Sequence, residues 1–363
     1  MLKIIVISSL VLLGLFIIFI LGAKYSLQRN RKKTKDDIIT FMKKNPEDWS
    51  LSVIQNGEVV MQHNEDTVFP LASTVKILHA VAFIEAVSEQ RLDPEEVVAI
   101  KDLNLLYIPN TDGNAHTEWK EREHIGDEVT LKQIAQGMMK YSSNACTDYL
   151  YYRLGKKAIE QVAIKYELTQ QTAIFPIGVA VLIPSYLHIE EQVTKKALAK
   201  TMQQLTSEEY AQIADNLLHK ILRNEAESLK EHVSLIAPRK IQKEITKRLP
   251  AATSQNYATF MYELGAGDSL SNEEQERFDE IMGPLYEHDA IRLWTKGGST
   301  MYVLTYAAFQ QNEKEQLSYA FFIEDTVSVD LMWITNCIAD FHKSFLQDNT
   351  FRNKVCHTIT IPK

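Results

Sequence analysis

The sequence predicts an α+β domain: strands from both ends of the chain form one antiparallel sheet, packed with helices and extended by an all-helical lobe. An alternating hairpin lies near residues 49–61, and β-like apolar runs return near residues 291–323. The stretch between these strands has mostly helical hydrophobic spacing. Strands at both ends with helices between them are typical of the α+β class.

An apolar segment precedes this domain. Residues 4–22 contain no charge, and as a helix they would extend about 28 Å, close to the hydrocarbon thickness of a bilayer. A cleavable signal peptide normally has a shorter apolar region and a small-residue cleavage site. We therefore interpret residues 1–23 as an uncleaved transmembrane anchor and residues 24–46 as a basic juxtamembrane linker.

Composition excludes several classes of function. Of the 363 residues, 45% are hydrophobic and 24% are charged, as in ordinary globular proteins. The formal charge of -8 leaves no basic surplus for binding nucleic acid, and three cysteines are too few for a disulfide framework. His116, Glu118 and His124 lie close together without the spacing of metal ligands. We interpret their stretch as a solvated loop and expect neither a metal nor a cofactor.

The strands and the added helices follow from local patterns. In the opening hairpin, apolar residues alternate on both sides of Asn56-Gly57, the pair that tight two-residue turns favour. Residues 190–250 are charge-rich with few turn signals, and they predict an added helical segment. The carboxy-terminal part predicts three strands and a final amphipathic helix, near residues 291–294, 301–309, 317–323 and 329–346.

Ser73-Thr74-Val75-Lys76 opens a strongly apolar helix, predicted over residues 74–87. Ser73 stands beside the helix-end amides, and Lys76 projects from the same face one turn later. A serine hydroxyl is a poor nucleophile until a base removes its proton, and serine–lysine pairs are one recurring solution. The alternative is a capping serine and a solvent-facing lysine. Apolar residues cover nearly the whole helix, so we expect Lys76 to be buried.

Ser142-Ser143-Asn144 follows a helix predicted over residues 131–140. The Ser142 hydroxyl is a candidate proton relay between Lys76 and a leaving group. The Asn144 amide is a candidate to orient Lys76 or to bind a substrate carbonyl. Taken alone, this fragment is more typical of a helix-terminating turn.

Lys296-Gly297-Gly298 lies on a predicted strand, where paired glycines are otherwise unfavourable. Glycine in a strand marks a bulge or the close approach of a ligand or another backbone, here substrate along the strand edge. The N–H groups of Ser299 and Ser73 are candidate oxyanion donors, and Thr300 is a candidate contact for a substrate carboxylate. Burial and a second cation both lower a lysine pKa, so Lys296 would help Lys76 to exist as a neutral base.

In order and context, the three fragments resemble the S-x-x-K, S-D-N and K-T-G motifs of class A β-lactamases and penicillin-binding proteins. The similarity covers about residues 48–346 apart from the added segment, and it implies a serine hydrolase domain over residues 47–350. By this resemblance Ser73 is acylated with Lys76 as base and Ser142 as proton relay. Lys296 completes the catalytic set, and the substrate is bound by Asn144, Gly298, Ser299 and Thr300.

Three positions depart from the family pattern. Ser143 replaces the aspartate of S-D-N, and Gly297 replaces a hydroxyl residue that helps to hold a substrate carboxylate. In class A β-lactamases, an E-x-x-L-N loop supplies the glutamate that activates the deacylating water. Here residues 175–184 contain no carboxylate, with Glu167 too early and Glu190 too late. We therefore expect acylation without efficient β-lactam turnover.

The resemblance implies a membrane-anchored serine hydrolase acylated by a β-lactam or a cell-wall D-alanyl peptide. Its partners would be that substrate and the membrane, without nucleic acid. An esterase or amidase is the alternative if Gly297 has relaxed carboxylate recognition, and a non-catalytic binding or sensor protein is another. Six basic residues follow the apolar segment, which by the positive-inside rule favours a cytoplasmic domain. Because the resemblance requires export, we expect an extracytoplasmic domain on a single-pass anchor.

Overall fold

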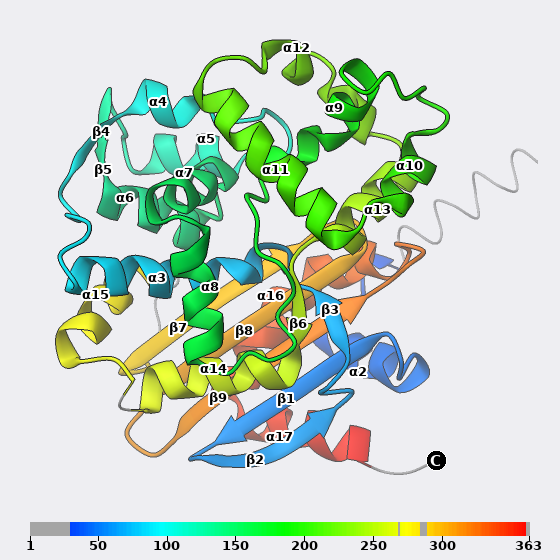
Figure 1. Cartoon of the computed structure of the whole chain (residues 1–363). Helices are drawn as coiled ribbons and strands as arrows, with labels where there is room; N and C mark the ends of the chain where they lie inside the picture. Colours follow the sequence, from blue (N-terminus) through cyan, green and yellow to red (C-terminus); the bar gives the residue numbers. More distant parts are fainter. Residues whose placement is uncertain (1–29, 268, 284–288, 361–363) are drawn as a thin grey trace, which may run out of the picture. The chain divides into compact units, whose positions relative to one another are not determined.

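The structure is a computed structural model that describes residues 30–267, 269–283 and 289–360 (Figure 1). It divides into two compact units, residues 47–326 and, together, residues 30–46 and 327–360. The predicted transmembrane anchor lies outside the described residues. Within the described part of the chain, no helix is both long and apolar enough to cross a membrane.

The larger unit is built on a five-stranded antiparallel sheet, which confirms the predicted fold class. The strand order is β2-β1-β9-β8-β7, so the amino-terminal hairpin pairs directly with the last strand of the unit (Figure 1). Strand β7, which carries Lys296-Gly297-Gly298, is an edge strand. The strands are β1 (Trp49–Gln55), β2 (Glu58–His63), β7 (Arg292–Ser299), β8 (Val303–Gln311) and β9 (Gln316–Glu324).

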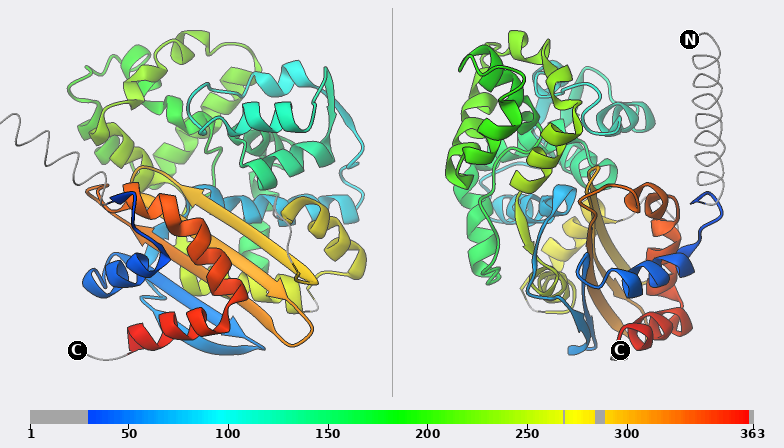
Figure 2. Two further views of the ribbon diagram at one scale, coloured as in Figure 1. Left: turned by 180° about the vertical axis from the view of Figure 1, so that it is seen from behind. Right: turned by 90° about the vertical axis from the view of Figure 1, so that its right-hand side faces the viewer.

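Helices of the larger unit cover one face of this sheet (Figure 2). Helix α14 (Ser254–Ala266) packs on β1, β8 and β9. Helix α3 (Lys76–Ser88) follows a 3₁₀ turn (Ala72–Val75) and is buried on nearly every side, as its apolar circumference predicts. Ser73 lies in the 3₁₀ turn rather than in the helix proper. The helix therefore holds the candidate nucleophile against the core.

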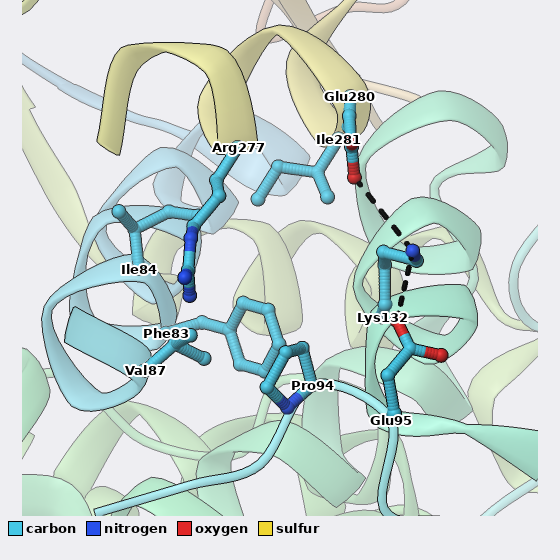
Figure 3. Close-up of a pocket in the computed structure, with 9 residues that line it drawn as sticks. All are labelled: Phe83, Ile84, Val87, Pro94, Glu95, Lys132, Arg277, Glu280 and Ile281. Carbon is cyan, nitrogen blue, oxygen red and sulfur yellow. Dashed lines mark ion pairs between the residues drawn. The ribbon is translucent and has the colours of Figure 1, made fainter. Parts of the chain in front are cut away.

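A cavity of about 210 Å³ borders α3 away from the predicted site residues (Figure 3). Its walls come from α3, α6 (Leu131–Gln136) and α15 (Asn272–Met282). Lys132 closes one end through ion pairs to Glu95 at 2.8 Å and Glu280 at 3.9 Å. These pairs link α6 both to α15 and to the chain segment that follows α3.

The added helical segment is longer than predicted. Thr172 N donates to Ala251 O at 2.9 Å, and Ala251 N donates to Thr172 Oγ1 at 2.8 Å. The chain thus leaves and returns at one point, and we call residues 173–250 the helical excursion (green in Figure 1). Its helices are α9 (Ile183–Ile189), α10 (Leu198–Gln204), α11 (Ser207–Leu222), α12 (Glu227–Lys230) and α13 (Arg239–Arg248).

The smaller unit corrects the predicted linker. Residues 35–44 form helix α2 (Lys35–Lys44), which packs against α16 (Leu331–Gln347) and α17 (Asn349–Thr360). Charged residues at both ends flank a short apolar face that helical spacing gathers on one side. The buried residues of that face are Ile38, Ile39, Phe41 and Met42. Helix α16 confirms the predicted final amphipathic helix, and α17 follows it.

Candidate active site

Three chain segments bring the predicted site residues together. Lys76 is the first residue of α3, Ser142 and Asn144 flank the start of α7 (Asn144–Leu154), and Lys296 lies on β7. Ser73 stands one turn before α3 and is partly exposed. The arrangement joins residues that are far apart in the sequence.

Lys76 is fully buried, as predicted, and its ammonium group has three oxygen partners. Nζ donates to Ser142 O at 2.7 Å, to Asn144 Oδ1 at 2.9 Å and to Ser142 Oγ at 3.3 Å. Burial lowers the pKa of Lys76 to about 8, against the opposing field of Asp148 and Asp112. A fraction of the lysine is therefore neutral near physiological pH.

Lys296 reaches the same serine from the other side. Its Nζ donates to Ser142 Oγ at 3.0 Å and to Gly297 O at 3.1 Å. Burial, and then repulsion from Lys76, lower the pKa of Lys296 well below its ordinary value. The Ser142 hydroxyl thus lies between two lysine nitrogens, a position from which it can pass a proton.

Ser142 has an uncommon backbone conformation. It follows a single π-helical turn (Gly137–Tyr141), and its φ of 72° lies in the left-handed region. Non-glycine residues adopt this region rarely, and both features are frequent at functional sites. Here the conformation lets the carbonyl and the hydroxyl of one residue both accept from Lys76.

The two glycines of the β7 motif have different surroundings. A Cβ on Gly298 would lie 2.5 Å from Leu71 O and 2.6 Å from Ser73 N, closer than real contacts allow. A Cβ on Gly297 would have its nearest atom at 3.6 Å. The close approach at Gly298 is therefore that of the Ser73 backbone, whereas Gly297 has room for a side chain.

Buried hydroxyls join this segment to the sheet. Thr305 Oγ1 on β8 donates to Leu71 O at 2.7 Å and lies 2.9 Å from Thr74 Oγ1. No sequence pattern indicated a role for Thr305, because a threonine in a strand is ordinary. The contact helps to fix the 3₁₀ turn that carries Ser73.

Ser299 and Thr300 line the cavity at the end of β7. Thr300 Oγ1 accepts the N–H groups of Tyr302 at 3.0 Å and Val303 at 3.2 Å, and the hydroxyl of Thr246 at 3.0 Å. Its oxygen therefore caps the β7–β8 turn.

Ser143, the departure from S-D-N, faces a separate network. Its Oγ accepts Cys146 N at 3.2 Å and lies 2.9 Å from His116 Nδ1. His116 Nε2 lies 3.1 Å from Asn104 Oδ1, so the partners assign the proton to Nε2. Burial, and then Lys120, lower the pKa of His116 to about 4 and keep the ring neutral.

The interpretation of a solvated loop is wrong for His116. The residue lies on helix α5 (Ala115–Arg122) and is 1% exposed, because Ser143 and Asn104 are brought to it from distant segments. Within the described residues, no cluster of histidine, cysteine or acidic side chains is arranged to hold a metal ion.

The loop without a carboxylate is held in place by an acid on α7. Asp148 is fully buried, and its two oxygens accept Gly178 N at 3.1 Å and Val179 N at 2.7 Å. Burial raises the pKa of Asp148 to about 7, although both N–H groups oppose this. Asp148 was not predicted, although it lies one helical turn after Asn144, which was a usable signal.

The substitution Gly178→Ala is expected to destabilise the fold by about 2 kcal/mol, because it overpacks this contact. A Cβ there would lie 2.5 Å from Asp148 Oδ2 and 2.9 Å from Asn144 Cβ. Urea unfolding measures the effect. Gly126→Ala is the matched control, since a Cβ at Gly126 meets nothing within 4 Å. Equal midpoints for the two variants would contradict the prediction.

A cavity of about 260 Å³ opens beside Ser73. Of the predicted residues, Asn144, Ser299 and Thr300 also line it. The helical excursion, which includes the loop of residues 175–184, contributes much of the remaining lining, together with Ala72, Asn110, Thr111 and Met301. None of the described residues that line the cavity is charged. The candidate nucleophile Ser73 and the candidate substrate-binding residues Asn144, Ser299 and Thr300 therefore meet at a cleft that can admit a small substrate.

Comparisons with known proteins agree with this geometry. Residues 32–296 match the model of the beta-lactamase enzyme family. The fold is similar to that of PBP-A (TM-score 0.51, 17% identity, covering 82% of this chain and 91% of PBP-A). It is also similar to that of a beta-lactamase from Sphaerobacter thermophilus DSM 20745 (TM-score 0.54, 18% identity, covering 90% and 98%).

A third structure, the TLA-3 extended-spectrum beta-lactamase, has a TM-score of 0.52 at 12% identity, covering 90% of this chain and 96% of that one. A search of curated proteins gave no match. At these identities the solved structures support the fold, while the family match spans most of the chain. The chain belongs to the beta-lactamase enzyme family.

Proposed function

We propose that this protein is a membrane-anchored serine hydrolase that forms an acyl-enzyme at Ser73 with a β-lactam or a D-alanyl peptide. The observation that carries the proposal is the Ser142 hydroxyl, held between Lys76 and Lys296 beside the Ser73 cavity. Family members named beta-lactamases and penicillin-binding proteins supply the substrate class by similarity.

The acylation step follows from these positions. Ser73 Oγ attacks the carbonyl carbon of the donor, and its proton passes to neutral Lys76 Nζ. The N–H groups of Ser73 and Ser299 would stabilise the oxyanion. As the bond from the carbonyl carbon to the leaving nitrogen breaks, Ser142 gives that nitrogen a proton and takes one from Lys76. Asn144 keeps Lys76 oriented throughout.

Deacylation lacks an equivalent base. The loop that supplies the glutamate in class A enzymes has no carboxylate here, and none of the described residues lining the cavity is acidic. Asp148 lies behind the loop with both oxygens bonded to backbone N–H groups. We therefore expect a long-lived adduct and little β-lactam turnover.

An esterase or amidase is the second candidate function. It is favoured by Gly297, which has no hydroxyl to hold a substrate carboxylate. The alkoxide that leaves an ester is also a better leaving group than the nitrogen that leaves an amide. Ester cleavage therefore makes a smaller demand on the proton relay. A preference for simple esters over β-lactams would select this candidate.

Labelling with a fluorescent penicillin tests the proposal, with Ser73→Ala as control. We expect a stable adduct on the wild-type protein only, and intact-mass measurements over time give its lifetime. If the wild-type protein forms no adduct and hydrolyses no ester, both enzymatic functions are excluded in favour of a binding or sensor role.

The acylation rate is expected to rise with pH through about 8 and to level off above it. Neutral Lys76 is the base, and its pKa of about 8 sets the midpoint. The measurement is the second-order labelling rate between pH 6 and pH 10. A rate that is independent of pH across this range would contradict the assignment of Lys76 as base.

The membrane part of the proposal rests on the apolar residues 4–22. We place the domain outside the cytoplasm, where cell-wall peptides occur. Fusion to a reporter that is active only outside the membrane tests this. Activity of a strictly cytoplasmic reporter instead would exclude a cell-wall substrate.

A further inference from the structure

The helical excursion supplies one wall of the Ser73 cavity. Beyond the loop of residues 175–184, its residues that line the cavity come from α11, from α13 and the residue that follows it, and from the 3₁₀ turn before α13 (Val233–Ile236). The apolar ones among them are partly or fully buried, so their side chains face protein or cavity rather than bulk water. These lining residues are Tyr210, Ile236, Gln242, Ile245, Thr246 and Leu249.

The wall is fixed relative to the nucleophile. At its end the excursion meets the segment before Ser73, where Leu71 N donates to Pro250 O at 2.9 Å. The next residues form β6 (Ala251–Thr253), which pairs with β3 (Val68–Pro70). Because these bonds join the excursion to the strand that leads into Ser73, its wall keeps one position beside the reacting bond.

The wall carries no charge. Burying an unpaired carboxylate or ammonium against such a surface is costly, whereas an apolar group gains from leaving water. Lys76 and Lys296, the two cations of the candidate site, are engaged with Ser142, Asn144 and Gly297. The wall therefore favours an apolar group of a bound molecule over a charged one.

Tyr210 adds one polar atom to this wall. The residue is 1% exposed and lines the cavity. Its ring packs edge to face on the ring of Phe175, with 5.5 Å between the two ring centroids. Among the described residues, its hydroxyl has no hydrogen-bond partner. Buried hydroxyls are almost always paired, so an unpaired one in a residue of the cavity wall is a candidate partner for a bound molecule.

We propose that the helical excursion is the specificity element of the enzyme. It selects acyl donors whose group beside the scissile bond is uncharged and apolar, with one hydrogen-bonding atom for the Tyr210 hydroxyl. This inference rests on the proposed acylation of Ser73, and it deepens that function by defining the acyl group.

Two penicillins that differ by one carboxylate test the inference. Benzylpenicillin carries an apolar phenylacetyl group, and carbenicillin carries the same group with an added carboxylate. Intact-mass kinetics give the second-order acylation rate for each. We expect wild-type protein to prefer benzylpenicillin by at least about tenfold, because carbenicillin would bring its charge against the uncharged wall.

The variant Ile245→Lys places a cation in the wall and is expected to reduce this preference by at least about tenfold. Ile189→Lys is the matched control, since Ile189 belongs to the same excursion, is 37% exposed and does not line the cavity. Tyr210→Phe keeps the ring and is expected to slow benzylpenicillin by about fivefold through the lost hydrogen bond.

Equal wild-type rates for the two donors, or equal ratios in the two lysine variants, would overturn the inference. If neither donor acylates any variant, the proposed acylation fails. The inference is then decided by ligand-observed NMR of Ser73→Ala with each penicillin. Selective binding of benzylpenicillin supports the specificity wall, and equal binding or none rejects it.

Discussion

The substitution Lys76→Met is expected to lower the rate of Ser73 acylation by on the order of 10³, the usual contribution of a positioned general base. Methionine has similar length and tolerates the fully buried site of Lys76, but it offers no nitrogen to accept the Ser73 proton. The second-order rate of labelling by a fluorescent penicillin measures the loss.

Lys132→Met is the matched control for this experiment. Lys132 forms its ion pairs at the cavity of Figure 3, away from the Ser73 site. The control is expected to label within about twofold of wild type, because exposed ion pairs contribute little. Thermal unfolding of both variants separates a lost base from a lost fold. Wild-type labelling by a folded Lys76→Met protein would exclude Lys76 as the base.

Adding one methyl group at Gly298 is expected to reduce acylation by about 100-fold or more, the cost of a small displacement at a reacting centre. The new Cβ of Gly298→Ala would collide with Leu71 O and Ser73 N, and backbone atoms on both sides cannot rotate away. Strand β7 would have to move from the nucleophile, and the Ser299 N–H would move with it.

The neighbouring glycine provides the comparison. Gly297→Ala adds the same methyl group where the nearest atom lies at 3.6 Å, an ordinary van der Waals distance. We expect this variant to label within about threefold of wild type. If both variants label alike, the contact between β7 and the Ser73 segment does not position the nucleophile.

Local pattern predicted the elements that carry chemistry. The apolar circumference of α3 predicted that Lys76 is buried, because a helix without a polar face has no solvent side. The Asn56-Gly57 turn predicted the hairpin, and both residues have the positive φ that such a turn requires. In both cases the residues that determine the local structure are close together in the sequence.

Features that depend on contacts between distant segments could not be predicted from local sequence patterns. His116 stands in a polar stretch, and only the folded chain brings Ser143 and Asn104 to its ring. Helix α2 has a short apolar face between charged ends, so its average composition resembled that of a linker. The contact of Asp148 with the Gly178 loop joins residues 30 apart in the chain, and no local pattern records it.

The hydrogen bonds between Thr172 and Ala251 affect which parts of this sequence can vary. Ser73, Lys76, Ser142 and Lys296 all lie outside the segment that these bonds close. The entropy of closing a loop rises only slowly with its length, so the closed segment tolerates growth or replacement. Under the proposed function, the chain therefore separates the residues that would break the bond from the segment that would select the acyl group. Mutation can revise the choice while leaving the reaction intact.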